Sequence, residues 1–352
     1  MAVTSDSSAQ ASPSPPGPAP RRALARVGAG PFRRFLTLRE GSIIVVTLIA
    51  IIYFASTTTS FFSGSHIKAL LPYFAPYAII AAGQVFVMTL GEIDLSIGAM
   101  YLFTPFLYYK LAKAGIPLVP SLIISLLVAM ALGAFNGFAT AYVKIASFVA
   151  TLGMLFVLDG VTLVISHSEQ VTTPGTTIVG TPTFANIFGA GTFSELIWAV
   201  GIVLILQVVL SFTRFGLYTV AVGGNRLGAS EAGINTKLVI VRNFTLCALT
   251  AGFVGLLEAI RTSSISPDPS GSNAILLQAI AAVIIGGTLM TGGAGTVVGA
   301  LIGALFLGVL NFGLVLKGVN ANYEDLYLGL AILIAMTVNV YVQRVRTGSG
   351  HG

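Results

Sequence analysis

Long apolar runs alternate with short polar connections along the chain after about residue 40. A helix that crosses a bilayer needs roughly 20 residues that are mostly apolar. The fold class predicted is therefore an all-α polytopic membrane protein. Its ten spanning segments are expected at about 42–60, 69–91, 95–113, 118–143, 147–166, 195–212, 238–261, 275–291, 295–315 and 323–343.

The two ends of the chain lack this pattern. Residues 1–38 carry six prolines among Ser, Ala and Gly. Such a segment cannot bury enough apolar surface to fold, so we expect a disordered cytoplasmic tail. The expected organisation is that tail, a transmembrane domain over 39–346 with a polar loop at 213–237, and a short C-terminal tail over 347–352.

The basic residues predict the orientation of the segments, because Lys and Arg favour the cytoplasmic side of a membrane. With an internal N-terminus, 13 of the 18 Lys and Arg residues lie inside and 5 lie outside. Both termini are then cytoplasmic. With eleven segments, either the tail arginines or Arg344 and Arg346 would lie outside the cytoplasm, so ten segments are favoured. The net charge of +6 follows from this topology and does not indicate a nucleic-acid partner.

Composition agrees with a cell-membrane location. Hydrophobic residues make up 55% of the chain and charged residues 9%, whereas soluble domains contain about a quarter charged residues. The 40 glycines suit helices whose backbones approach closely. Two stripes of small residues, at 133–137 and 295–303, favour packing within the chain over a subunit interface. Cys247 is the single cysteine and excludes an internal disulfide.

Several kinds of chemistry are absent from the sequence. It lacks the G-x-x-x-x-G-K-[ST] phosphate-binding loop, so hydrolysis of ATP by this chain alone is not expected. The three histidines are scattered and no Cys/His cluster accompanies them, so no metal site is expected. No nucleophile–base arrangement is evident. The chain is therefore predicted to be neither an enzyme nor the carrier of a cofactor.

The densest polar insertion between apolar segments is Gly91-Glu92-Ile93-Asp94-Leu95-Ser96-Ile97-Gly98. Asp94 and Ser96 have side-chain oxygens that can cap the following helix. One reading is a helix cap with a tight turn. The other is a direct role of Glu92, Asp94 and Ser96 in gating or in the solute pathway.

Three further polar residues lie within apolar segments. Asp159 is expected to face the bundle interior, a wet cavity or the outer boundary, because a charge at the membrane centre costs roughly 2.5–3.5 kcal/mol on insertion scales. Glu258 is three residues before Arg261 and can pair with it. Asn136 is expected to form a helix–helix hydrogen bond, with contact to solute as the alternative. Asp159 and Glu258 are candidates for the pathway or for internal pairing.

The polar loop over 213–237 contains a short stretch compatible with a helix. Gly223-Gly224 is expected to break the chain, Asn225 to cap a helix that contains Arg226 and Glu231, and Gly233 to end it. A short capped helix parallel to the membrane suits docking in a groove of another protein. A plain interfacial loop is the alternative. The long loop at 167–194 is expected outside, either as a connector or as a surface for an external partner.

Several stretches in this order resemble the permease subunits of ABC importers for monosaccharides, of the ribose, xylose and galactose type. The resemblance covers roughly 40–343. It rests on GEIDLSIG at 91–98, FVATLG at 148–153 followed by Gly160-Val161, AVGGN at 221–225 with AGIN at 232–235, and AIAAV at 279–283 with GGT at 286–288 and GGAG at 292–295.

This resemblance implies a type II ABC importer fold with two permease chains, either a homodimer or a heterodimer. It also implies two ATPase subunits that bind ATP and Mg²⁺, and an extracytoplasmic binding protein that delivers the solute. The ATPase-coupling segment then falls on Gly224, Asn225, Arg226, Glu231, Ala232, Gly233 and Ile234.

Four positions depart from the family pattern and put a ribose-like solute in doubt. Glu92 stands where glycine is usual, Asp159 where arginine is frequent, Gln278 where an acidic residue is common and Ala294 where a basic one is. The expected function is translocation of a sugar or polyol. The alternatives are an ABC permease for branched-chain amino acids, nucleosides or a signalling furanose, and an ion-coupled secondary transporter that uses Asp159 or Glu258.

Overall fold

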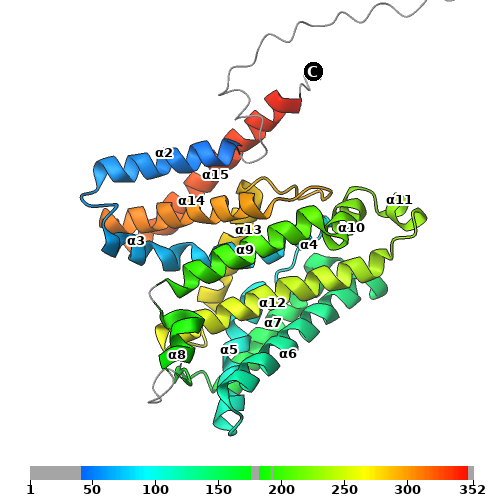
Figure 1. Cartoon of the computed structure of the whole chain (residues 1–352), viewed down its shortest axis with the longest axis horizontal. Helices are drawn as coiled ribbons and strands as arrows, with labels where there is room; N and C mark the ends of the chain where they lie inside the picture. Colours follow the sequence, from blue (N-terminus) through cyan, green and yellow to red (C-terminus); the bar gives the residue numbers. More distant parts are fainter. Residues whose placement is uncertain (1–40, 176–181, 192, 348–352) are drawn as a thin grey trace, which may run out of the picture.

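The computed structural model describes residues 41–175, 182–191 and 193–347. The tail expected over 1–38 lies outside the described residues, and so does the C-terminal tail apart from Thr347. Described residues are mainly helical (Figure 1). The first half of the chain forms α2 (Gly41–Thr57), α3 (Gly64–Leu70), η1 (Leu71–Tyr73), α4 (Ala75–Thr89), α5 (Ile97–Lys113), α6 (Leu118–Phe138), η2 (Ala139–Val143) and α7 (Ser147–Ser166).

The second half begins with β1 (Val171–Thr172), α8 (Pro182–Ala185) and η3 (Asn186–Ala190). It continues with α9 (Ser194–Phe212), α10 (Arg214–Gly224), α11 (Arg226–Glu231), α12 (Thr236–Thr262), β2 (Ser264–Ile265), α13 (Pro269–Ile285), α14 (Val297–Leu316), η4 (Ala321–Tyr323) and α15 (Glu324–Thr347). Each of the ten segments predicted to span the membrane therefore contains a described helix.

The boundaries predicted for the eighth segment, 275–291, were wrong by about six residues. Helix α13 begins at Pro269, with Asp268 as its N-cap accepting a bond from the Ser270 N–H, and it ends at Ile285. Gly287 has a φ of +92° and turns the chain immediately afterwards. Residues 286–296, which are mainly glycine and threonine, consequently form a connection.

Within the described residues, six helical stretches are long and apolar enough to cross a membrane. Several of these helices carry outward-facing apolar side chains, which suit contact with lipid. The protein is therefore a helical, polytopic membrane protein. The six stretches are Gly64–Thr89, Leu118–Val143, Ser147–Ser166, Ser194–Phe212, Thr236–Thr262 and Val297–Leu316, and the outward-facing residues include Leu127, Phe135, Phe156, Val164, Ile197, Ile205 and Phe212.

Helix α4 lies at the centre of the molecule, and nearly all of its residues are buried. One apolar cluster joins it to α2, α9, α13 and α14. A second cluster joins it to α5, α6, α7 and α12. Figure 1 shows the corresponding arrangement, with α2 and α14 on one side of the bundle and α6 and α7 on the other. The C-terminal end of α4 leads directly into the polar motif that begins at Gly91.

Close helix contacts use the predicted small-residue stripes. A Cβ added at Gly137 of α6 would lie 2.6 Å from the Val241 Cα of α12, and one at Gly133 would lie 2.6 Å from the Phe244 carbonyl oxygen. In the other stripe, Gly299 and Gly303 of α14 face the backbone at Gly286 and Ala282. Packing within the chain, the favoured expectation for both stripes, is confirmed.

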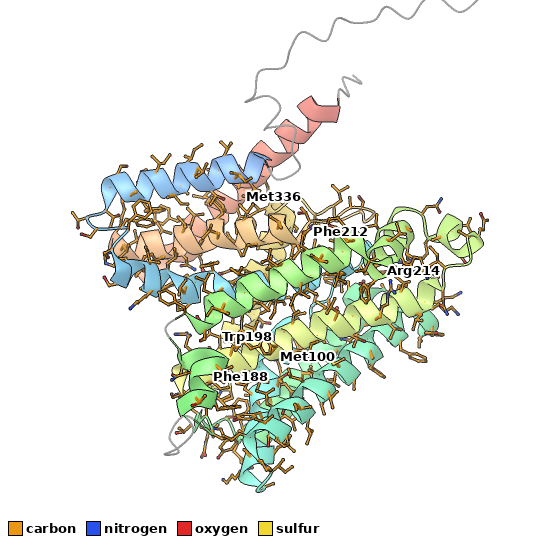
Figure 2. The ribbon with its side chains drawn as sticks, in the orientation of Figure 1. Met100, Phe188, Trp198, Phe212, Arg214 and Met336 are labelled. Atoms are coloured by element: carbon orange, nitrogen blue, oxygen red, sulfur yellow. The ribbon has the colours of Figure 1, made fainter. Side chains whose placement is uncertain are left out.

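The connections between helices gather at two opposite ends. At one end, the α4–α5 connection contacts α7, where the Ile93 N–H donates to the Ser147 hydroxyl over 3.3 Å. At the other end, β1 pairs antiparallel with β2, Val171 opposite Ile265, and the Tyr108 hydroxyl donates to the Pro174 carbonyl over 3.0 Å. The start of the long 167–194 loop is thus fixed to its neighbours. In Figure 2, Trp198 of α9 lies beside Phe188 at this end, with the rings stacked 6.0 Å apart.

Candidate functional site

The loop over 213–237 folds into α10 and α11 at the end of the bundle opposite α8 (Figure 1). Figure 2 places Arg214, the first residue of α10, at this same end. The predicted break at Gly223-Gly224 was wrong, because α10 continues through both glycines. The direction changes instead at Asn225, whose φ of −154° and ψ of 96° are extended.

Helix α11 is capped as expected. The Asn225 Oδ1 accepts from the Gly228 N–H over 2.9 Å. At the other end the Gly233 N–H donates to the Ser230 carbonyl over 3.0 Å, and Gly233 takes a φ of +82° that suits glycine at this position. Arg226, Glu231, Ala232 and Gly233 are exposed and Ile234 is half-buried, so α11 presents a short, firmly ended and mostly uncovered helix.

The motif over 91–98 runs through a turn and an irregular stretch before α5 begins at Ile97. Asp94 and Ser96 are fully buried. The Asp94 Oδ1 accepts from the Ser96 N–H over 2.8 Å and from the Ser96 hydroxyl over 2.6 Å. The Asn136 amide of α6 in turn donates to the Ser96 hydroxyl over 2.9 Å. The partner is the residue that precedes α5, so this bond joins α6 to the α4–α5 connection and not to another helix.

Capping of α5 differs from the expectation. Ser96 occupies the N-cap position, but its backbone is helical and its hydroxyl makes no bond to the first turn. Asp94 stabilises the turn before the helix instead. Its second oxygen, Oδ2, is buried without a hydrogen-bond partner. Burial in this connection outweighs the two bonds from Ser96 and raises the pKa of Asp94 to about 6.

Three connections meet beside α11, and we call their meeting point the three-loop junction. It consists of Thr89–Glu92 at the end of α4, Gly223–Arg226 where α10 passes into α11, and Thr291–Gly293 between α13 and α14. The Gly293 N–H donates to the Thr89 carbonyl over 2.8 Å. A Cβ added at Gly292 would lie 2.8 Å from the Gly91 nitrogen and 2.9 Å from the Gly223 carbonyl oxygen. Side chains larger than hydrogen do not fit between these backbones.

An ion pair that the sequence did not predict crosses this junction. The Arg226 guanidinium lies 2.7 Å from the Glu92 carboxylate, with 48% of the Arg226 side chain and 15% of the Glu92 side chain exposed. The two residues are separated by 134 positions, so no local pattern connects them. The pair joins the expected coupling helix directly to the motif that precedes α5.

Glu258 lies at the opposite end of the bundle, in an ionic cluster. Its pairing with Arg261 is confirmed, with the Arg261 Nη2 2.7 Å from the Glu258 Oε2. Glu195 at the start of α9 was not expected to take part, but its Oε1 lies 2.9 Å from the Arg261 Nε. Two carboxylates therefore share one guanidinium. Glu258 also lines a small cavity of about 70 Å³, together with Tyr101 and Thr262.

Asp159 stands apart from both groups. It lies on α7, is 8% exposed, and its Oδ1 is buried without a hydrogen-bond partner. Of the candidate pathway residues, Asp94, Ser96 and Asn136 form one hydrogen-bonded group, and Glu92 of the same connection contacts α11. Asp159 and Glu258 lie elsewhere. Sequence reasoning missed Glu195 and the Glu92–Arg226 pair, both of which depend on tertiary contacts.

Residues 66–336 match the family described as the permease component of the branched-chain amino acid transport system. The chain belongs to this permease family. Curated relatives of the permease include the xylose/arabinose import permease XylH of Sulfolobus acidocaldarius, which is 32% identical over 89% of this chain and 86% of that protein.

Two ribose import permeases named RbsC are also similar to the permease. That of Escherichia coli K12 is 33% identical over 87% of this chain and 96% of its own length. That of Bacillus subtilis is 36% identical over 85% of this chain and 90% of its own length. No solved structure matches the permease. Family membership and the apolar helices together make it an integral protein of the cell membrane.

Proposed function

We propose that the permease is the membrane-spanning subunit of an ATP-driven ABC importer for a sugar or polyol. The proposal is supported most by one observation, the similarity over most of the chain to curated sugar import permeases. Its transmembrane domain covers residues 39–346 and spans the membrane ten times in the type II importer fold. Both termini lie in the cytoplasm, as the bias of basic residues favours.

Helix α11 is the part of the permease that docks on the ATPase subunit. Its exposure, its caps at Asn225 and Gly233, and its place at the end with more basic residues support this role. ATP and Mg²⁺ are bound by the ATPase. Closure of the ATPase pair on binding ATP moves α11, and a rigid-body change of the permease then alternates access to the pathway.

The solute arrives at the end that carries the β1–β2 pair, from an extracytoplasmic binding protein. Two permease chains form the pathway. Glu92, Asp94, Ser96, Asn136, Asp159 and Glu258 are its candidate lining or gate residues, and among them Glu258, beside the cavity at the outer end, is the first that solute would reach.

Reconstitution tests the proposal. The purified permease is placed in liposomes with the ATPase subunit that purifies with it and with its loaded binding protein, and uptake of labelled monosaccharides is measured. Uptake is expected to require ATP and both added proteins, and the permease alone is expected to show no ATP turnover. Uptake that survives ATP depletion and collapses with an ionophore would instead identify an ion-coupled secondary transporter.

A further inference from the structure

We propose that the Glu92–Arg226 ion pair transmits movement of α11 to the connection that begins α5. This inference rests on the proposed docking of α11. Its starting point is the weak attachment of α11 to the rest of the permease. All six residues of α11 are described, and among them Ala229 alone is buried. A helix so little covered needs a further link if its movement is to reach the helices of the bundle.

The backbone contacts at the three-loop junction do not provide a side-chain link. They are made at Gly91, Gly223, Gly292 and Gly293, which offer no side chains to interlock. The Gly293 N–H bond to the Thr89 carbonyl fixes the α13–α14 connection to α4, and neither residue belongs to α11. Arg226, in the first turn of α11, provides a side-chain contact across the junction, because its guanidinium lies 2.7 Å from the Glu92 carboxylate.

On the far side of the ion pair, Glu92 belongs to a segment that is held at several points. The next residue, Ile93, donates its N–H to the Ser147 hydroxyl over 3.3 Å, and the Leu95 N–H donates to the Thr151 hydroxyl over 3.0 Å. Both acceptors lie in the first turns of α7. A displacement of Glu92 therefore acts on α7 as well as on its own chain.

The same segment continues into α5 and is bonded to α6. Asp94 holds Ser96, and Ser96 accepts from Asn136 of α6. A pull on Glu92 consequently reaches α5, α6 and α7 together. These three helices lie on one side of α4 in Figure 1, so the ion pair connects α11 to one half of the bundle.

The strength of the pair sets the size of the expected effect. The Arg226 side chain is about half exposed, and exposed pairs contribute up to about 1 kcal/mol, which corresponds to a factor of about five. Reversing one charge replaces the attraction by a repulsion of similar size. Each single reversal removes the attraction and adds the repulsion, so it should reduce coupled activity by up to roughly thirtyfold, and it should leave folding intact.

Charge exchange tests the inference in the assembled transporter. The variants are Glu92→Arg, Arg226→Glu and the double exchange, compared in nanodiscs with the co-purifying ATPase subunit. The measurements are ATPase binding, stimulation of ATP hydrolysis by the loaded binding protein, and solute transported per ATP. The matched control is Lys144→Glu, a reversal at an exposed residue of the same end that makes no ion pair in the described part of the chain.

Both single reversals are expected to reduce stimulation and transport per ATP, and the double exchange to restore them to within about twofold of the unaltered permease. Glu92→Arg should leave ATPase binding unchanged, because only 15% of the Glu92 side chain is exposed. Full coupling in Glu92→Arg, or no recovery in the double exchange, would overturn the inference. So would weakened ATPase binding in Glu92→Arg. If the unaltered permease neither binds nor stimulates the ATPase, the proposed function itself fails.

Discussion

The buried carboxyl of Asp94 predicts an unusual dependence of stability on pH. Its pKa is raised from the ordinary value of 3.8 to about 6 by burial. The folded state therefore holds its proton at pH values where the unfolded chain has lost it. Stability from this group is fully present below pH 3.8 and is lost as pH rises through about 6. A difference of roughly two pKa units corresponds to about 3 kcal/mol.

The substitution Asp94→Asn removes this titration and keeps an oxygen that can accept both bonds from Ser96. Melting of detergent-purified permease is followed by the fluorescence of Trp198, the single tryptophan. Between pH 4 and pH 7, Tm of the variant relative to the unaltered permease should rise by roughly 5 °C, given 2–4 °C per kcal/mol for smaller domains.

A matched control separates this effect from the general loss of one carboxylate. Asp268→Asn removes an exposed carboxylate that also accepts a backbone N–H bond, from Ser270 over 2.9 Å. Parallel curves of Tm against pH for Asp94→Asn and the unaltered permease would show that burial does not raise the pKa of Asp94. The argument from its buried Oδ2, which has no hydrogen-bond partner, would then fail.

Three further predictions concern the helices. Gly233→Pro, which cannot keep a φ of +82°, and Glu231→Lys should each abolish uptake and ATPase stimulation without loss of membrane insertion. Glu169→Lys, at an exposed residue of the other end, is the control and should retain both activities. Normal transport by Gly233→Pro and Glu231→Lys would refute the coupling role. Gly137→Leu should lower the free energy of unfolding by about 1–3 kcal/mol, because it overpacks α6 against α12. Its Tm should therefore be lower than that of Gly160→Leu, whose added Cβ meets open space. Equal Tm values would contradict this prediction. Arg261→Gln should lower the free energy of unfolding by about 3–5 kcal/mol, because it leaves Glu195 and Glu258 without their cation. Adding Glu195→Gln to the same chain should recover part of this loss. An unchanged yield of folded Arg261→Gln would contradict the prediction.

Local signals explain which parts of the fold could be predicted from the sequence. Apolar length located the helices, and the Asn225 cap and Gly233 located α11 because both act on neighbouring backbone groups. The start of α13 was also readable, because Asp268-Pro269 is an N-cap followed by a favoured first-turn proline.

Tertiary contacts explain what the sequence could not supply. Glu92 looks like a departure from a glycine position until the fold brings Arg226 beside it. Glu195 looks like the end of a long loop until α9 and α12 pack and place it on Arg261. In both cases the partners come from distant parts of the chain, and only the packing of whole helices determines which charges meet.

The central position of α4 has a consequence for how the permease is made. In the finished protein α4 is enclosed by other helices, including α12, α13 and α14, which are synthesised well over a hundred residues later. During biogenesis α4 must therefore reside in lipid before most of its final neighbours exist, and its apolar sequence serves that earlier stage. Gln84, buried in α4, accepts from the Cys247 thiol of α12 over 3.0 Å, a partner that is synthesised 163 residues later. Assembly of the bundle around α4 is thus a late event, which follows insertion of the second half of the chain.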